Sequence, residues 1–286
     1  MDQRAPDSLF DGKTFVDLSH WRKIAVSGGD TFSWLNSLIT ADIEDLGPGR
    51  ARRSLLLSPT GRVRAEFTVT VPGGTVVLVQ DPEQPRSIMD LLTPYVLSSD
   101  VELEDRTLDL GLLAFPRRET LPVAPGAAFS SPSVLGPGVD VILLAEDHRA
   151  LSLEFAKSYR TAGNEELEAW RIAAGLPRIG IDVTEEDLPQ ESRLEEAVSF
   201  DKGCFLGQEA VAKVRNLGHP RRVLLSLEAD RSLSPGDPIM VNGDEVGRIT
   251  SASGTEIGSV SLGRVKWDAR VGPFRTAGGQ PLRVRS

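Results

Sequence analysis

The sequence predicts an α+β fold that ends in a small antiparallel β-barrel. Over its first two thirds the chain mixes strand and helix patterns without the regular strand–helix alternation of a parallel sheet. From about residue 219, short strand patterns follow one another with Gly-rich turns and no helical pattern between them. A chain of 286 residues is long enough for two or three domains. We therefore expect two α+β domains over 1–110 and 111–218, and the barrel over 219–286.

The first domain should begin with two short strands in 15–28, followed by a helix. Asp30 suits the N-cap of that helix, because apolar residues recur at helical spacing over 31–40. A meander follows over 51–80, with reversals at "SPTG" and "PGG". From 62 to 71, apolar and polar residues alternate strictly, which predicts a strand with one buried face and one polar face.

The later elements are read from the same two periodicities. Asn242-Gly243 is a strong hairpin signal within the barrel. Disorder is expected in the first few residues and over 121–138, where Pro, Gly, Ser and Ala dominate. The remaining patterns predict helices at 88–95, 147–161 and from 164 to the "GLP" stop at 175–177, and strands at 108–115 and 139–145.

Composition excludes several classes of protein. Hydrophobic residues make up 40% and charged residues 26%, as in soluble globular proteins, and no apolar run could span a bilayer. The start resembles neither a signal peptide nor a transit sequence, so a cytoplasmic protein is expected. A net charge of −9 disfavours bulk nucleic-acid binding, although it allows a local basic patch. One cysteine and three scattered histidines predict no disulfide and no metal site.

Common catalytic motifs are missing as well. The sequence has no G-x-x-x-x-G-K-[ST], no G-x-G-x-x-G after a strand, no G-x-S-x-G and no H-E-x-x-H. Nucleotide hydrolysis, Rossmann redox chemistry, serine hydrolysis and zinc proteolysis therefore lose their usual support.

The single cysteine, Cys204, lies in "DKGCFLGQEAVAKV", where a Gly-containing turn runs into a helical pattern. Unpaired N–H groups at a helix start, together with Lys202 two residues away, would favour a thiolate. A lone cysteine is also often a small, buried and inert residue. The residue pattern leaves both interpretations open.

Two polar clusters are further candidates. Arg62, Arg64 and Glu66 on the polar face of the 62–71 strand suit a carboxylate or phosphate and a ring N–H pair, but they equally suit a solvated face. The second cluster adjoins the inferred junction with the barrel, where a ligand pocket or a basic linker is expected; it comprises Arg215, His219, Arg221 and Arg222.

The segment "KGCFLGQE", 202–209, resembles the K-G-C-[FY]-x-G-Q-E signature of the YgfZ family, folate-binding relatives of the glycine-cleavage aminomethyltransferase (T-protein). Three more stretches, 16–43, 58–69 and 171–194, resemble other parts of this superfamily, so the resemblance covers most of 15–222 with gaps. It implies a ring of α+β (ferredoxin-like) domains and a C-terminal barrel around a central hole where tetrahydrofolate binds.

The resemblance also implies roles for individual residues. Cys204 becomes the functional thiol, with Lys202 beside it as a second catalytic residue. The rest of the motif shapes the loop, namely Gly203, Phe205, Gly207, Gln208 and Glu209. The folate cavity would be formed by Thr40, Asp42, Arg64, Glu66, Trp170, Arg171 and Glu191.

Two positions depart from the aminomethyltransferase pattern. Glu66 stands where those enzymes have a catalytic Asp. Ala173 stands where they have a Glu that pairs with the N–H groups of a pterin, a charge-assisted contact worth about 1.5–3 kcal/mol per hydrogen bond.

The implied function is that of a tetrahydrofolate-binding accessory protein for iron–sulfur cluster assembly or repair and, in bacteria, tRNA thiomodification, which uses the Cys204 thiol beside the central folate cavity. Its expected partners are reduced folate and iron–sulfur enzymes or cluster-assembly proteins, with no membrane and a monomeric chain. One alternative is an enzyme, an aminomethyltransferase or demethylase that moves a one-carbon unit from an amine to tetrahydrofolate. Another is a scaffold that binds something other than folate.

Overall fold

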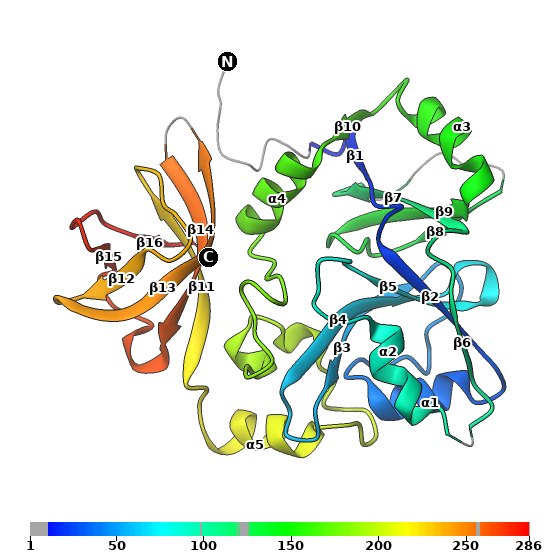
Figure 1. The fold of residues 1–286 in the computed structure, drawn as a ribbon, viewed down its shortest axis with the longest axis horizontal. Coiled ribbons are helices and arrows are strands. Elements are labelled where there is room, and N and C mark those ends of the chain that lie inside the picture. The colour runs from blue at the N-terminus through cyan, green and yellow to red at the C-terminus, as the bar shows by residue number, and fades with distance from the viewer. Residues whose placement is uncertain (1–10, 98, 119, 121–125, 256–257, 286) are drawn as a thin grey trace.

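The computed structural model describes residues 11–97, 99–118, 120, 126–255 and 258–285. Three sheets organise these residues, and Figure 1 shows the third of them standing apart, separated from the other two by α4 (Asn164–Ala173) and the chain that follows it. The predicted α+β class is confirmed, and the predicted C-terminal strands form an antiparallel sheet. None of the described helices is long and apolar enough to cross a bilayer.

The first sheet is antiparallel and has the strand order β3-β4-β5-β2-β6. Its strands are β2 (Arg22–Ser27), β3 (Ala51–Leu57), β4 (Val63–Thr70), β5 (Val76–Gln80) and β6 (Glu102–Asp105). Two helices, α1 (Thr31–Leu38) and α2 (Ile88–Leu92), cover one face, and the short 3₁₀ turns η2 (Pro72–Gly74) and η3 (Thr93–Tyr95) lie in its connections.

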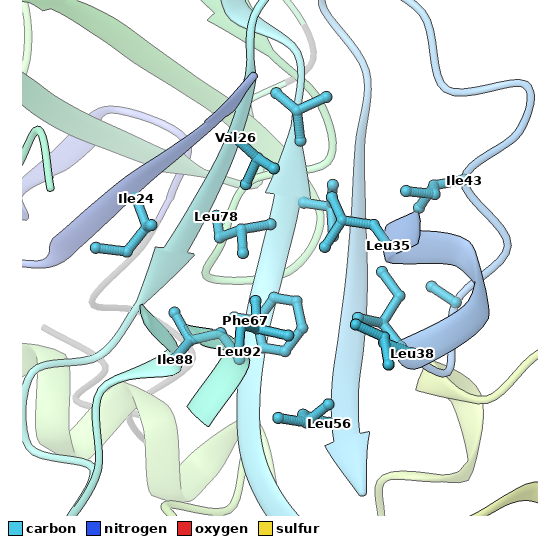
Figure 2. Packing of buried hydrophobic residues seen from close by; sticks show 14 of the residues in the cluster. Ile24, Val26, Leu35, Leu38, Ile43, Leu56, Phe67, Leu78, Ile88 and Leu92 are labelled. Carbon is cyan, nitrogen blue, oxygen red and sulfur yellow. The ribbon is translucent and has the colours of Figure 1, made fainter. Parts of the chain in front are cut away.

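The strict alternation of β4 determines which face packs against the helices. Phe67 of β4 lies against Leu35 and Leu38 of α1 and Leu92 of α2, as Figure 2 shows. The polar residues of the same strand consequently point away from this core. Asp30 occupies the N-cap position of α1 as predicted, but its carboxylate makes no capping bond and instead accepts a hydrogen bond from the Asp100 N–H at 2.9 Å.

The second sheet has the order β10-β1-β7-β9-β8 and is flanked by α3 (Ala145–Phe155) and α4. Its strands are β1 (Thr14–Asp17), β7 (Leu110–Pro116), β8 (Ala127–Ser130), β9 (Gly138–Leu144) and β10 (Arg160–Ala162). Although β1 is near the start of the chain, it pairs with β7 and, in parallel, with β10. The predicted boundary at residue 110 divides the chain by sequence order, but β1, which precedes this boundary, belongs to the second sheet. The three-domain division remains a prediction.

The expectation of disorder over 121–138 was wrong for the residues that the structure describes. Residues 127–130 form β8, which pairs with β9, and the following loop is packed. Local composition misled because β8 is held by its backbone pairing with the next strand, β9, which the Gly, Pro, Ser and Ala content of the stretch does not reveal. Residues 121–125, like 1–10, lie outside the described part of the chain.

The third sheet is antiparallel, with the order β15-β12-β13-β14-β11-β16, and curls into a half-barrel. The predicted Asn242-Gly243 turn is present between β12 and β13, with positive φ at both residues (52° and 93°). Between the second and third sheets lie η4 (Pro189–Glu191), η5 (Glu195–Ala197) and α5 (Gln208–Leu217). The strands are β11 (Arg222–Ala229), β12 (Pro238–Val241), β13 (Asp244–Thr255), β14 (Gly258–Lys266), β15 (Arg275–Thr276) and β16 (Arg283–Val284), with η6 (Trp267–Ala269) after β14.

Candidate functional site

A cavity of about 540 Å³ lies where the polar face of the first sheet meets α4 and the loop 132–137. Its walls include the aromatic side chains of Trp21 and Trp170 and several charged groups. A volume of this size, with apolar walls and a few polar groups, is typical of a small-molecule site. The polar and charged side chains among its walls are Arg53, Glu66, Thr68, Asp81, Gln84, Ser133, Arg171, Arg178 and Glu196.

Glu66 is held in this cavity by two neighbours. Its Oε1 accepts a hydrogen bond from Arg53 Nε at 2.5 Å. The Gln84 side chain binds the Glu66 backbone on both sides, donating to its carbonyl at 2.7 Å and accepting from its N–H at 3.1 Å. Because β4 and β5 pair only from Thr68 to Thr70, Gln84 supplies the hydrogen bonds that the neighbouring strand no longer makes.

The cavity's other charged groups are mostly engaged with each other. Arg178 pairs with Asp81 at 3.2 Å and with Glu168 at 3.0 Å. Arg171 contacts Glu168, Asp182, the Leu176 carbonyl and Ser251, which uses its guanidinium fully. No hydrogen bond within the described chain engages Glu66 Oε2 or the Glu196 carboxylate. These two carboxylates are therefore the acceptors available to a ligand.

These two acceptor carboxylates suit a pterin-like heterocycle, which presents N–H donors. A carboxylate can accept two parallel N–H groups from the edge of such a ring, and tryptophan walls can pack against its faces. Ala173 does not line the cavity: its side chain packs near Ile172 toward the half-barrel. The substitution at that position therefore removes no group from the cavity seen here.

The loop that carries Cys204 is held by Lys202 and Phe205, on either side of the cysteine, and by Gly207 at its end. Lys202 Nζ donates to Asn36 Oδ1 at 3.0 Å and to the carbonyls of Ile39 and Ala41 at 2.9 Å and 2.6 Å. Phe205 is buried in an apolar cluster. Between these two anchors the Cys204 side chain is exposed to solvent.

Gly207 fixes the end of this loop against the hairpin between β3 and β4. Its φ is +80°, and a Cβ at this position would lie 2.4 Å from the Ser58 carbonyl oxygen. Helix α5 begins at the next residue, so that Gln208 and Glu209 form its first turn. The sequence suggests that Cys204 lies at or just before the helix start, but it precedes the N-cap, Gly207, by three residues and is not part of the first turn.

The role expected for Lys202 needs correction. Its three N–H groups all bind oxygen atoms of the segment 36–41, which leaves none for the Cys204 sulfur. Burial lowers the pKa of this ammonium to about 8, while Asp42 and Glu44 oppose the shift. Lys202 is an anchor of the loop in this structure.

The structure brings only part of the predicted cofactor set together. Glu66, Trp170 and Arg171 line the cavity. Thr40 is buried and donates to the Ala197 carbonyl at 2.6 Å, and Arg64 pairs with Glu185 at 3.0 Å.

The other predicted residues lie outside the cavity. Glu191 is buried and accepts from the Leu188 and Arg221 N–H groups. Asp42 lines a second hollow of about 370 Å³, which shares Arg53, Pro132 and Glu196 with the cavity. Neither hollow has Cys204 in its walls.

Several cavity residues were missed from the sequence. Arg53 is not among the candidates from the sequence, yet it pairs with Glu66 across the β3–β4 hairpin. That pairing follows from counting outward from the predicted turn at 58–61, so a register argument would have found it. Gln84, Arg178, Glu196 and the loop 132–137 carry no comparable local signal.

Comparison with known proteins adds to this picture. The family described as the GCVT N-terminal domain matches residues 11–115. An Enterobacter protein named tRNA-modifying protein YgfZ is 25% identical over 88% of this chain and 83% of its own length. A chloroplastic protein of Arabidopsis thaliana with a provisional transferase name is 28% identical, over 94% of this chain and 68% of the relative.

A solved structure shows the same fold. The glycine cleavage system aminomethyltransferase T from Bartonella henselae superposes with a TM-score of 0.81 at 22% identity, covering 96% of this chain and 85% of that one. The fold is therefore that of an aminomethyltransferase. The matched domain over residues 11–115, together with relatives named tRNA-modifying protein YgfZ and aminomethyltransferase, agrees with the resemblance noted at the cysteine motif.

Proposed function

We propose that this protein binds a reduced folate in the central cavity and serves, through the Cys204 thiol, as an accessory factor for iron–sulfur cluster assembly or repair. The observation that carries the folate part is the Glu66 carboxylate, fixed by Arg53 and Gln84 inside an aromatic-walled cavity of about 540 Å³. The relatives support the superfamily; the iron–sulfur role rests on the cysteine motif.

In this proposal Glu66 Oε2 accepts N–H groups of the pterin, and Trp21 and Trp170 contact its ring. The Glu196 carboxylate, at the border with the second hollow, is the second acceptor. Tetrahydrofolate would supply nitrogen atoms that carry one-carbon units. The protein's own contribution is to fix the ring and to exclude water from it.

Cys204 does not lie in the walls of the cavity, contrary to what the resemblance implies, so the thiol would act at a different place from the folate. Because its side chain is exposed and absent from the cavity walls, it is accessible to a macromolecular partner. The anchored loop presents this thiol in one place. We accordingly propose that the thiol meets the client protein at the surface, while folate occupies the cavity. An effect on tRNA thiomodification would follow indirectly, through the iron–sulfur enzymes involved, and the proposed location is the cytoplasm.

Complementation tests the thiol. A deletion strain should regain its iron–sulfur enzyme activities with the wild-type chain and fail to do so with Cys204→Ser, at equal protein levels. Full rescue by Cys204→Ser would eliminate the role of the thiol.

Calorimetry tests the cavity separately. Glu66→Gln should weaken 5-formyltetrahydrofolate binding about 10-fold to 100-fold, the loss of one charge-assisted pair. Glu185→Gln is the matched control, because Glu185 is paired with Arg64 outside the cavity and should bind as wild type does. Absence of folate binding by the wild type would favour a scaffold for another ligand.

A second candidate function is the transfer or removal of a one-carbon unit from an amine to tetrahydrofolate. Glu66 favours it, because a carboxylate held in the cavity could act as a base or bind an ammonium group. This activity predicts amine-dependent turnover that Glu66→Gln abolishes and Cys204→Ser leaves intact. If no turnover is detected with methylated amines and folate, this candidate is excluded.

A further inference from the structure

A basic surface lies where α5 meets the half-barrel, outside both the cavity and the cysteine loop. It is formed by Arg221 and Arg222, just before and at the first residue of β11, Lys266 at the end of β14, Arg270 after η6, and Arg193 from the loop between η4 and η5. We call these five side chains the basic face. In the described part of the chain no ion pair joins any of them to a carboxylate, although Glu195 and Asp268 lie in the same region.

This lack of neutralisation differs from the rest of the half-barrel. Arg222 and Lys266 are direct cross-strand partners in the β11–β14 ladder, and both are exposed. Like charges placed opposite each other destabilise a sheet. The other cationic cross-strand pair, Arg248 and Arg264, is neutralised by Glu245 and Asp187. The uncompensated repulsion indicates that the basic face meets an anionic partner.

Stacked rings adjoin the basic face. The rings of His219 and Trp267 are parallel, with an interplanar angle of 1° and centroids 5.3 Å apart. The Arg270 guanidinium carbon lies 3.9 Å from the Trp267 ring centroid. His219 is exposed, which leaves it accessible to one more planar group. Arg215, by contrast, is already occupied over the Phe200 ring.

A hollow of about 350 Å³ lies beside the stack and is lined by Trp267, Arg270, Arg193, Glu195 and Gln190. Gln190 donates to the Val211 carbonyl of α5 at 3.0 Å, while its Oε1 is buried and has no hydrogen-bond partner in the described structure. An unsatisfied buried acceptor of this kind costs free energy unless a ligand or water supplies a donor. In the walls of the hollow, Arg193, Glu195 and Arg270 provide polar groups suited to the edge of a base.

From these features we infer that the basic face and the His219–Trp267–Arg270 stack bind a single-stranded segment of RNA. Phosphates would meet the five cations, and an unpaired base would stack on His219 or enter the hollow. Single-stranded RNA is commonly recognised in this way, by aromatic and guanidinium stacking beside a basic surface. An acidic peptide would use the cations but has no need for the stack. The inference does not depend on the folate cavity.

Fluorescence anisotropy with a labelled ten-nucleotide RNA of mixed sequence tests this on the full chain. The double variant Arg222→Gln/Lys266→Gln should bind at least tenfold more weakly. Its plot of log affinity against log salt should be shallower by about 1.4, the value for two lost phosphate contacts on a single strand. His219→Ala should weaken RNA binding but leave the binding of inorganic polyphosphate unchanged.

The matched control is Arg231→Gln/Arg275→Gln, which removes two exposed cations, one following the far end of β11 and one on β15. It should bind RNA as the wild type does, and folate titrations should be unchanged in every variant. Equal RNA binding by the Arg222/Lys266 double variant, or equal weakening by the control, would overturn the inference. So would the absence of RNA binding by the wild type. If polyglutamate displaces the RNA and His219→Ala has no effect, the face binds acidic protein instead.

Discussion

Gly207 positions the loop that carries Cys204 because it has no side chain. Its φ of +80° disfavours any other residue, and the Ser58 carbonyl lies where a Cβ would be. Gly61 of the same hairpin approaches α5 equally closely, with a built Cβ 2.9 Å from the Ala210 Cβ. Two glycines that are distant in sequence thus allow the hairpin and the cysteine loop to pack backbone to backbone.

We expect Gly207→Ala to lower the free energy of unfolding by about 1–3 kcal/mol, since both the strained φ and the carbonyl contact must be relieved. Gly203→Ala provides the control, because Gly203 lies in the same loop, between Lys202 and Cys204. No heavy atom lies within 4 Å of a Cβ there and its φ is not positive, so its change should stay within about 0.5 kcal/mol. Urea unfolding of the two variants decides; equal effects would contradict this explanation.

Residue roles were predictable from the sequence only where local pattern determined them. The alternation in 62–71 correctly predicts that Glu66 points away from the core. The helical pattern from residue 164 correctly predicts that Trp170 lies on a helix. Lys202 was misassigned because its acceptors lie in segment 36–41, more than 150 residues away. No spacing rule links an ammonium to carbonyls at that distance along the chain.

At the scale of elements, the loop 132–137 forms one wall of the cavity, although its composition predicts disorder. Asp140 of β9 holds this loop by accepting hydrogen bonds from Ser133 Oγ at 2.5 Å and from the Val134 N–H at 2.8 Å. The carboxyl is buried, at 2% exposure. Burial raises its pKa from the ordinary value of 3.8 to about 7, against the two hydrogen bonds, which lower it.

This raised pKa predicts a pH dependence. Between about pH 4 and pH 7 the folded protein holds a proton on Asp140 that the unfolded chain has released, so the free energy of unfolding falls as pH rises through this range. Asp140→Asn, which stays neutral, should lack this fall and gain stability relative to the wild type toward pH 8. Urea unfolding at pH 5, 6, 7 and 8 measures the difference. Parallel pH profiles for the two proteins would contradict it, because their other titrating groups are shared.

The element types were predicted better than their partners. The hairpin turns, α4 and the strands of the half-barrel follow from turn residues and periodicity, which act within a few positions. The pairing of β1 with β7 and β10 depends on contacts across about 100 and 145 residues, and no local signal specifies it. The cavity combines the first sheet, the 132–137 loop and α4. Because the relative placement of these elements depends on such long-range contacts, local patterns do not predict the cavity.

At the scale of the whole molecule, a buried polar network attaches the half-barrel to the remainder. The Asp182 carboxylate is fully buried and accepts hydrogen bonds from Arg171 Nη1 at 2.7 Å and the Arg178 N–H at 2.9 Å. It also accepts from Thr250 Oγ1 at 2.5 Å and Ser251 Oγ at 2.7 Å, both in β13. One carboxylate thus joins α4, the chain after it and the half-barrel.

We expect Asp182→Ala to lower the free energy of unfolding by about 3–5 kcal/mol, because buried Arg171 would lose its fully buried counter-ion and the Arg178, Thr250 and Ser251 donors would lose their acceptor. The half-barrel should then melt separately, giving two calorimetric transitions where the wild type gives one. Asp182→Asn, which keeps the shape and one acceptor, should show a smaller shift in the same direction if the alanine variant does not fold.

The exposed pair Arg248–Glu245 on the same sheet provides the comparison, with side chains that are 58% and 44% exposed. Glu245→Gln should change stability by less than about 1 kcal/mol and leave the single transition intact, since solvent screens such pairs. A single transition in both Asp182 variants would mean that apolar contacts between α4 and the half-barrel, such as Ile172 with Leu224 and Leu262, couple the two parts without the network. Two transitions would show that Asp182 couples the half-barrel to the rest of the molecule. Because Asp182 also holds Arg171, which lines the cavity, the same carboxylate would then contribute to the rigidity of the cavity wall.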